Sequence, residues 1–395
     1  MVRPLTAQRV FFPGLDGLRF IAALSVLVQH VVQFQALFGF GAPGWFHRLF
    51  LTGRDGVILF FVLSGFLITY LLVEELGRLG SIDIGRFYVR RILRIWPLYF
   101  LVLVIAVALY AFGAATPGWR QPDGAGDFIL YALLLANVVA AWGTPALGVS
   151  QAWSIGVEEQ FYLVWPAFLL LFARRLLAFT ITFVLLKVVL LWVLIRVLGE
   201  FAPTTVFVQQ LALESMAIGA IGAVLVYRRA AILRLLFHPV AQLAALAAFA
   251  LVVYDFDGIF GRTPAAATTL LSLVFVLVIL NVGCNERTLL RIGNPVTDYL
   301  GRISYGIYML HPVLLYGIFF AVRGLGWNPG RNLALLAAIY IVGVGASIAV
   351  AAFSYAFFEA PFLRLKKRFA RVESGGDDLP VGGLAGAPAA IATPR

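Results

Sequence analysis

Charged residues are scarce in this sequence, and cysteine is almost absent. Lys, Arg, Asp and Glu together make up 12% of the 395 residues, whereas 62% are hydrophobic. A water-soluble domain of this length cannot hide so large an apolar fraction, because its surface must still contact water. Cys284 is the one cysteine, which excludes an internal disulfide and a cysteine-based metal site. The chain is therefore neither a soluble globular domain nor a disulfide-stapled one.

The formal charge of +11 could suggest a nucleic-acid partner, but the basic residues fall in short clusters between apolar runs. That distribution is typical of a membrane protein oriented by its cytoplasmic Lys and Arg. No phosphate-cradling glycine-rich loop is present, which argues against ATP. His47 and His238 have no carboxylate or cysteine at metal-ligand spacing. We therefore expect no nucleic acid, no metal and no permanently bound cofactor.

The apolar runs predict an all-α polytopic membrane protein with about ten transmembrane helices and both ends on the same side. Because the loops are short, we expect one membrane-embedded domain over residues 1–370. Residues 371–395 are rich in Gly, Ala and Pro and predict a disordered cytoplasmic tail. The predicted spans are 17–38, 56–73, 92–112, 153–173, 176–198, 205–227, 232–253, 265–283, 303–322 and 332–357.

One apolar segment, residues 128–142, is left out of these spans. As a helix it would be about 22 Å long, and it contains Asn137. If this segment does not cross, the cytoplasmic side holds 22 of the 30 Lys and Arg residues. If it crosses, every later loop changes side and the cytoplasmic side holds only 12 of them. The positive-inside rule favours the first arrangement. We expect the segment to be re-entrant or to lie on the outer surface.

The stretch Leu15–His30 combines charge at its start with an imidazole at membrane depth. Arg19 and His30 are eleven residues apart, about 16 Å and just over three helical turns, so they lie on nearly the same face. His30 then reaches roughly the middle of a hydrocarbon core of about 30 Å. An ionisable group at that depth is a functional-site hypothesis. The alternative is a neutral histidine that is hydrogen-bonded to a neighbouring helix.

The stretch Phe87–Pro97 places Arg90, Arg91 and Arg94 at the cytoplasmic mouth of the third span. Their spacings of three and four residues put them on one helical face. Guanidinium groups suit phosphates because each can donate two hydrogen bonds at once. The cluster thus predicts a site for a phosphorylated cytoplasmic ligand, and ordinary positive-inside anchoring is the alternative.

The stretch Trp153–Pro166 enters the membrane from the outside and brings Glu158 toward the depth of His30. A carboxylate can orient an imidazole that moves a proton, so the two groups predict acid–base chemistry near the middle of the membrane. The polar residues nearby, Trp153, Ser154, Gln160 and Tyr162, would contribute to the same cavity. An interfacial aromatic belt is the alternative, although it explains the acidic residues poorly.

A second buried imidazole, His311, lies in the stretch Gly301–Pro312. Ser304 shares its helical face, and Tyr305 and Tyr308 lie on an adjacent one, so these residues predict a further polar wall of the cavity. Hydrogen bonding between helices explains them equally well. Ser64 and Gly65 in an apolar span favour close helix packing. Glu359, among basic residues, is expected to be a structural ion-pair partner.

Taken together, these stretches resemble the acyltransferase 3 family of membrane O-acyltransferases. Six pieces recur in family order over nearly the whole chain: LDGLR…H at 15–30, FFVLSGFL at 60–67, FYVRRILRIWP at 87–97, WSIGVEEQFYLVWP at 153–166, SYGIYMLHP at 304–312 and FEAPF at 358–362. The resemblance implies a ten-helix domain that takes an acyl group from cytoplasmic acyl-CoA as co-substrate. It also implies a hydroxyl acceptor on a sugar of a glycan, glycolipid or secreted glycoside, and a bacterial inner membrane.

The family patterns fall on residues that depth and helical face already single out. Acyl-CoA binding is expected from Arg19, Arg90, Arg91 and Arg94, and catalysis from His30 and Glu158. His30 either deprotonates the acceptor directly or first accepts the acyl group, and the sequence does not decide between the two. Acetyl is the default acyl group.

The strongest rival is a proton-coupled transporter or flippase of a glycolipid or acylated carrier, in which the buried His and Glu relay protons. It does not require the Arg cluster, and the inverted repeats common in transporters are not evident. A membrane scaffold without chemistry would leave His30, Glu158 and His311 unexplained. The acceptor stays open among a polysaccharide, a lipid-linked sugar and a small metabolite, and the oligomeric state is open as well.

Overall fold

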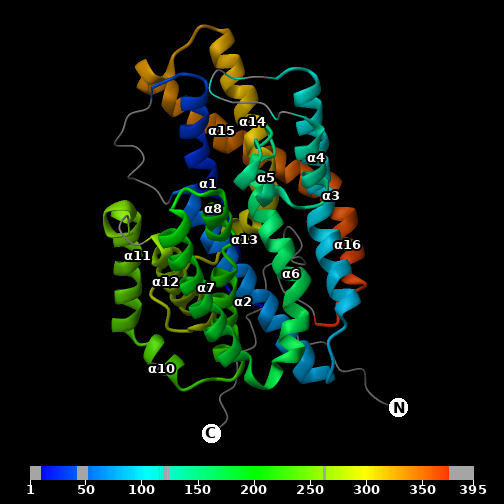
Figure 1. Cartoon of the computed structure of the whole chain (residues 1–395), viewed down its shortest axis with the longest axis vertical. Coiled ribbons are helices and arrows are strands. Elements are labelled where there is room, and N and C mark those ends of the chain that lie inside the picture. Colours follow the sequence, from blue (N-terminus) through cyan, green and yellow to red (C-terminus); the bar gives the residue numbers. More distant parts are fainter. Residues whose placement is uncertain are drawn as a thin grey trace.

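The structure, a computed structural model, describes residues 10–41, 52–114, 116, 118, 122, 124–260 and 264–372; side chains are described in these ranges except at 252–260 and 264–266. All regular elements in this part of the chain are helices (Figure 1), which confirms the all-α membrane fold. His47 and most of the expected tail 371–395 lie outside the described residues. The division into a domain over 1–370 and a tail stays a prediction.

Eight helical segments in the described part are long and apolar enough to cross a membrane. They are α1 (Leu15–Leu37), α2 (Gly53–Leu79), α3 (Ile84–Ala111), α7 (Leu176–Leu198), α8 with α9 (Pro203–Gln210, Leu213–Tyr227), α12 (Pro264–Cys284), α14 (Ser304–Gly324), and α15 with α16 (Leu333–Ser354, Ala360–Lys367). Helices also form at two further predicted spans, α6 (Trp153–Leu171) and α11 (Pro239–Phe260), which are not among the eight. The predicted count of ten is thus not confirmed, and for α6 the acidic pair Glu158–Glu159 lowers its apolar character.

Residues 128–142 form two short helices rather than one. α4 (Ala125–Ala132) and α5 (Ala136–Trp142) are about 12 and 10 Å long, so neither can cross the membrane. The chain turns between them at Leu134, which has a left-handed backbone with a φ of 61°. α5 packs against α6 and α8, so protein covers one side of this part of the segment, whereas Ile129 and Leu133 are exposed.

The predicted span 205–227 is interrupted between α8 and α9. At the interruption, the backbone carbonyl of Leu211 accepts from the N–H of Leu213 at 2.6 Å and from Lys187 of α7 at 3.2 Å. The same ammonium forms a 2.7 Å ion pair with Glu214 at the start of α9, and both side chains are buried. The apolar character of residues 205–227 does not reveal this break, because Lys187, which binds the carbonyl at the break, lies on α7. The predicted span 232–253 is likewise divided, into α10 (Ile232–Leu236) and α11.

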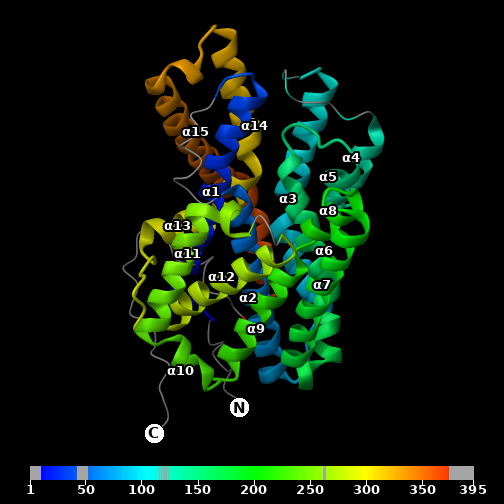
Figure 2. The same cartoon turned by 60° about the vertical axis from the view of Figure 1, so that its left-hand side comes forward.

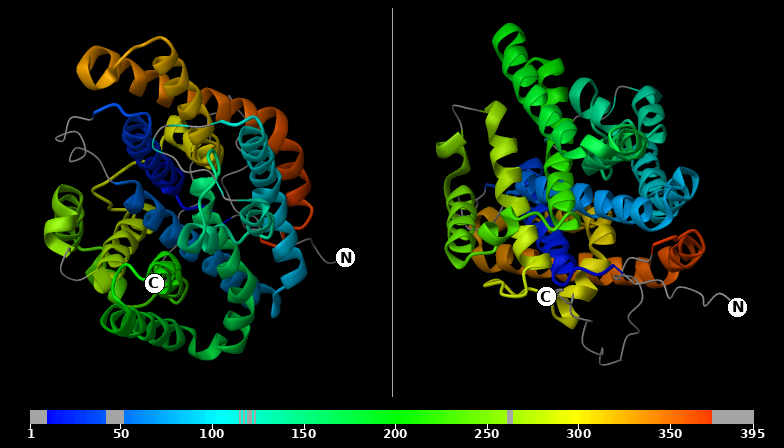
Figure 3. Two further views of the ribbon diagram at one scale, coloured as in Figure 1. Left: turned by 45° about the horizontal axis from the view of Figure 1, so that its top comes forward. Right: turned by 90° about the horizontal axis from the view of Figure 1, so that it is seen from below.

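α2 lies near the centre of the bundle, where it packs most extensively against α9 and also contacts α1, α12 and α6 (Figure 3). In Figure 2, α11, α12 and α13 (Pro295–Arg302) lie on one side of α2, and α3, α6 and α7 lie on the other. Close packing depends on glycine: a Cβ at Gly65 would lie 1.9 Å from the carbonyl oxygen of Met216, and one at Gly219 would lie 2.1 Å from that of Val62. The expected packing role of Gly65 is therefore confirmed.

The α2–α3, α6–α7 and α9–α11 connections, the last containing α10, lie at one end of the bundle (Figure 1). These connections and the helix ends beside them carry basic clusters such as Arg174–Arg175 and Arg228–Arg229. One-sided basic loops are the pattern from which the sequence predicts a cytoplasmic face.

Candidate active site

A cavity of about 150 Å³ lies among α1, α2, α3, α6, α14 and α16. Its wall is mixed, with apolar rings such as Phe60 and Phe61 beside charged and hydroxyl groups. Eight of the predicted site residues line it: Arg19, Arg91, Arg94, Ser154, Glu158, Tyr162, Ser304 and Tyr305. Groups that are distant in the sequence are thus gathered around one space.

Glu158 is held inside the cavity by two hydroxyl groups. Ser64 Oγ donates to its Oε1 at 3.0 Å, and Tyr162 Oη donates to its Oε2 at 2.9 Å. Ser64 comes from α2, whereas Glu158 and Tyr162 lie one turn apart on α6. Hydrogen bonds to a carboxylate are worth about 1.5–3 kcal/mol each, so this arrangement fixes the orientation of the acid. Among the described hydrogen bonds, none joins Glu158 to His30.

Arg91 faces Glu158 across the ring of Tyr162. Its guanidinium carbon lies 5.8 Å from the ring centres of both Tyr162 and Phe87. In the described part of the chain, its buried Nε atom has no hydrogen-bond partner. A buried donor without a partner is costly, so this atom is suited to a ligand oxygen. Arg94, one turn further on, also lines the cavity and interacts electrostatically with Glu359.

Glu359 belongs to a π-helical turn, Tyr355–Glu359, between α15 and α16. Its side chain is buried and accepts from Ser354 Oγ at 3.1 Å. Single π-turns occur frequently at functional sites. Lys366 of the following α16 reaches the cavity wall.

Arg19 forms a 3.1 Å ion pair with Asp16, and both side chains line the cavity at the start of α1. Next to them lies α13, which approaches α1 so closely that a Cβ at Gly301 would lie 2.1 Å from the carbonyl oxygen of Asp16. Burial raises the pKa of the Asp298 carboxyl on α13, and the Asp16 charge adds to that shift. This end of the cavity thus contains both signs of charge.

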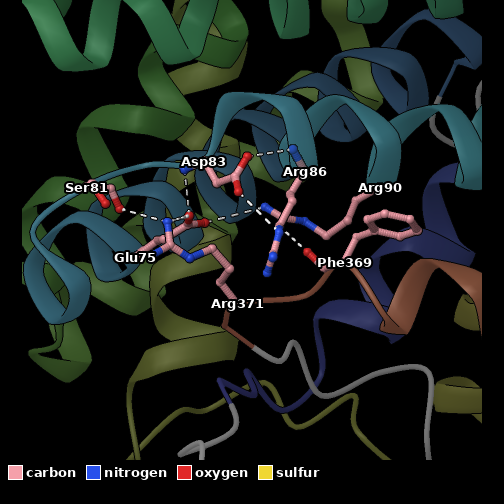
Figure 4. Close-up of polar contacts among 7 residues, drawn as sticks. All are labelled: Glu75, Ser81, Asp83, Arg86, Arg90, Phe369 and Arg371. Carbon is pink, nitrogen blue, oxygen red and sulfur yellow. Dashed lines mark hydrogen bonds and ion pairs between the residues drawn. The ribbon is translucent and has the colours of Figure 1, made fainter.

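The structure does not place Arg90 in the cavity. Its guanidinium forms an ion pair with Glu75 at 3.5 Å and donates to the backbone carbonyl of Phe369 at 2.8 Å (Figure 4). Glu75, which is buried, also accepts from Arg371 Nη1 at 3.1 Å and from the backbone N–H of Asp83 at 2.9 Å. Arg90 therefore links α3 to α2 and to the chain that follows α16. The sequence prediction grouped it with Arg91, but neighbouring helical residues point about 100° apart.

Two other predicted cavity residues lie outside it. Gln160 exchanges hydrogen bonds of 3.2 and 3.0 Å with Asn137 of α5, so it connects α6 to the non-crossing segment. Trp153 packs edge-on against Phe61, with ring centres 6.2 Å apart. Both contribute to the packing of α6 rather than to the cavity wall.

His30 and His311 form a pair beyond the cavity. His30 Nδ1 lies 2.7 Å from His311 Nε2, across α1 and α14. His311 is fully buried, whereas His30 is half-buried. Among the described side chains, neither lines the cavity. Each of the two imidazoles thus has the imidazole of the other helix as its partner. This contact agrees with the alternative of a histidine that is hydrogen-bonded to a neighbouring helix, and the catalytic role of His30 stays a prediction.

Tyr308 separates the imidazole pair from the cavity. Its side chain lines the cavity, while its ring packs edge-on against His311 with ring centres 6.1 Å apart. Its hydroxyl donates to the carbonyl of Gln151 at 2.8 Å and lies 2.7 Å from Ser154 Oγ. Tyr308 thus lines the cavity, as its place beside Tyr305 on α14 predicts. The sequence analysis did not identify Ser64 or Lys366 as site residues, because their roles depend on contacts between helices.

A family model described as an acyltransferase domain matches residues 12–355. The chain is 31% identical over 180 residues to the peptidoglycan O-acetyltransferase of Listeria monocytogenes, which covers 44% of this chain and 26% of that protein. It is 33% identical over 173 residues to a protein named as a candidate peptidoglycan O-acetyltransferase in Bacillus subtilis, covering 42% of this chain and 24% of that one.

A longer match, 25% identical over 389 residues, is to a protein named as a candidate O-acetyltransferase in Staphylococcus aureus; it covers 89% of this chain and 57% of that protein. The chain therefore spans between about a quarter and somewhat over half the length of these curated relatives. No solved structure matches the chain.

Proposed function

Because this chain belongs to the acyltransferase family, we propose that it transfers an acetyl group from cytoplasmic acetyl-CoA to a hydroxyl group of a glycan. The relatives' names, which specify O-acetyltransferases and in two cases peptidoglycan, support the acetyl group and a sugar acceptor. The single observation that carries the donor side is the basic cavity, in which the Nε of Arg91 has no partner among the described residues.

The donor would enter from the cytoplasmic face. Arg91, Arg94 and Lys366 come from two helices and line one side of the cavity, so they can hold phosphate oxygens. A volume of about 150 Å³ is small beside the roughly 300–1,000 Å³ of sites that enclose a drug-sized ligand. The cavity would accommodate the thioester end of the donor rather than the whole molecule. That size also favours a short acyl group.

His30 would act as the base of the reaction. It takes the proton of the acceptor hydroxyl as the hydroxyl oxygen attacks the thioester carbonyl carbon. When the tetrahedral intermediate collapses, the carbon–sulfur bond breaks, and the thiolate leaves and receives that proton. The balance is one ester and one thiol from one thioester and one alcohol. The thioester must pass Tyr308, which lies between the cavity and the imidazole pair.

Glu158 would act on the donor side of Tyr308. Its carboxylate orients the hydroxyls of Ser64 and Tyr162 and balances the charge of Arg91, whose guanidinium lies over the Tyr162 ring. This role differs from the sequence prediction, in which Glu158 orients or polarises near the middle of the membrane for acid–base chemistry with His30. In the proposed arrangement, Glu158 shapes the donor site and His30 moves the proton.

The proposed orientation puts both ends of the chain in the cytoplasm of a bacterial cell and the acceptor on the outside. The basic connections at one end of the bundle support it (Figure 1). Cysteine accessibility is a direct test: the sequence contains Cys284 alone, so a Cys284→Ser background accepts single reporter cysteines. A cysteine in the α6–α7 connection should be protected from an impermeant reagent in intact cells and react after lysis.

The function is tested with purified protein in detergent or lipid, acetyl-CoA and a soluble peptidoglycan fragment. We expect release of free CoA thiol and an acetyl ester on the fragment. His30→Ala should lower turnover while leaving the affinity for acetyl-CoA unchanged, and Arg91→Ala should weaken that affinity. Absence of both CoA binding and thiol release by the wild type would overturn the proposal and favour the transporter. Acetyl label retained on the protein would identify the covalent route.

A further inference from the structure

We infer that His311 is a positioning residue, which fixes the tautomer of His30 and leaves His30 Nε2 as the basic nitrogen. This inference rests on the proposed function for its meaning in catalysis, but its geometry stands on the described contacts alone. His311 acts through His30 and does not line the cavity.

The proton positions follow from a backbone carbonyl. His311 Nδ1 lies 3.0 Å from the carbonyl oxygen of Ile307, and a carbonyl oxygen can only accept, so Nδ1 carries the hydrogen. A neutral imidazole has one N–H, so His311 Nε2 is an acceptor. The 2.7 Å contact then requires His30 Nδ1 to donate. By the same rule, His30 Nε2 has no hydrogen and presents a lone pair.

The burial of His311, and the lack of a carboxylate partner for either ring among the described residues, support the neutral form of both. His311 has no exposed surface, and in the described part of the chain no ion pair or hydrogen bond joins a carboxylate to either imidazole. A second proton on His311 would be a buried charge without a counter-ion, which is costly. The pair therefore differs from the common arrangement in which a carboxylate orients a catalytic histidine. Here a backbone carbonyl sets the direction of the hydrogen-bond chain, and a neutral imidazole transmits it.

Pro312 frees a further backbone carbonyl on α14, next to the Ile307 carbonyl that His311 contacts. Pro312 follows His311 and has no N–H, so it cannot bond to the carbonyl of Tyr308 one turn earlier. The helix is thus locally relieved of one backbone hydrogen bond beside the Ile307 carbonyl.

The tautomer can be measured directly, because the chain has four histidines. Solid-state NMR of ¹⁵N-histidine-labelled protein in lipid reports which nitrogen of each ring is protonated, and the variants His30→Gln and His311→Gln assign the two signals. We expect His30 to be protonated at Nδ1 and unprotonated at Nε2, with the same tautomer for His311. Protonation of His30 at Nε2 in the wild type would overturn the inference, whether or not the protein shows transferase activity.

Kinetics supply the functional readout. His311→Ala removes the acceptor, and we expect kcat for thiol release to fall at least about tenfold with an unchanged KM for acetyl-CoA. His311→Gln keeps an acceptor oxygen and should restore part of that loss. Equal losses in kcat for both variants, with the His30 tautomer unchanged in His311→Ala, would also overturn the inference. A wild type that shows the expected tautomer but releases no thiol would instead overturn the proposed function.

Discussion

The same substitution at two adjacent arginines should weaken donor binding at Arg91 and reduce protein stability at Arg90. Arg91→Gln removes a cavity guanidinium whose Nε has no partner in the described structure, so it should weaken donor binding. Arg90→Gln removes a link between Glu75 and the Phe369 carbonyl, so it should reduce stability instead. Glutamine preserves much of the aliphatic packing in both cases.

The expected magnitudes follow from the contacts. The Glu75 side chain is 2% exposed and that of Arg90 is 12% exposed, so the pair is largely screened from water. Breaking a buried pair costs about 3–5 kcal/mol when an uncompensated charge remains. Because Arg371 and the Asp83 N–H still bind Glu75, we expect a loss nearer that of one charged hydrogen bond, about 1.5–3 kcal/mol. For Arg91→Gln, loss of a charged hydrogen bond of the same size predicts a rise in the KM for acetyl-CoA of about 10- to 150-fold.

Thermal unfolding of the solubilised protein and thiol release at varied acetyl-CoA concentration measure the two effects. Arg86→Gln is a matched control on the same helix, since Arg86 pairs with Asp83 at 3.2 Å but is 52% exposed. An exposed pair is worth about 0–1 kcal/mol, so this variant should change neither quantity appreciably. If Arg90→Gln raised KM as much as Arg91→Gln and left the unfolding temperature unchanged, the assignment of the two arginines would be refuted.

Three further predictions concern packing, catalysis and pH. Gly65→Ala should destabilise the protein by about 1–3 kcal/mol, since the new Cβ would meet a backbone carbonyl of α9. Gly317→Ala is the control and should be neutral or stabilising, because among the described residues no atom outside the local helix backbone lies within 4 Å of its Cβ position. Equal melting temperatures of the two variants would contradict the packing argument. His30→Gln should reduce kcat by about 10²–10⁴ and leave CoA binding intact, as calorimetric titration can check. Burial and then the Asp16 charge raise the pKa of Asp298, so the folded state binds a proton on this carboxyl more tightly than the unfolded chain does. The stabilisation from the bound proton is complete below the ordinary aspartate pKa and is lost as pH rises through the raised pKa. Asp298→Asn should therefore remove this decline in stability from melting curves recorded across that pH range.

The sequence allowed the helical membrane fold to be predicted, because long apolar runs dictate it. The non-crossing segment near Asn137 was also predictable, since charge counting shows which loops change side. The break between α8 and α9 could not be predicted, because Lys187, which donates to the Leu211 carbonyl at the break, lies on another helix. Local apolarity reports what a segment can bury, but an interruption depends on what its neighbours can satisfy.

The candidate site was likewise predictable only in part, because spacing along one helix does not reveal the partners on other helices. Spacing on one helix placed Arg91 and Arg94 together, and the cavity contains both. Spacing could not tell that Arg90 is bound to Glu75, because that partner belongs to α2. The pairing of His30 with His311 joins residues 281 positions apart, so periodicity gives each residue's depth and face but not its partner.

Depth and face are nevertheless what connect the cavity to the imidazole pair. On α1, the eleven residues from Arg19 to His30 complete three helical turns to within about 20°, and on α14 the seven residues from Ser304 to His311 complete two turns to within about 20°. Arg19 and Ser304 line the cavity at the lower ends of these intervals, and the two imidazoles meet at the upper ends. The two helices thus fix the distance between donor site and base by length and their alignment by register. Inserting one alanine between Arg19 and His30 would turn the imidazole by about 100° and separate it from His311, even though every residue of the site would still be present.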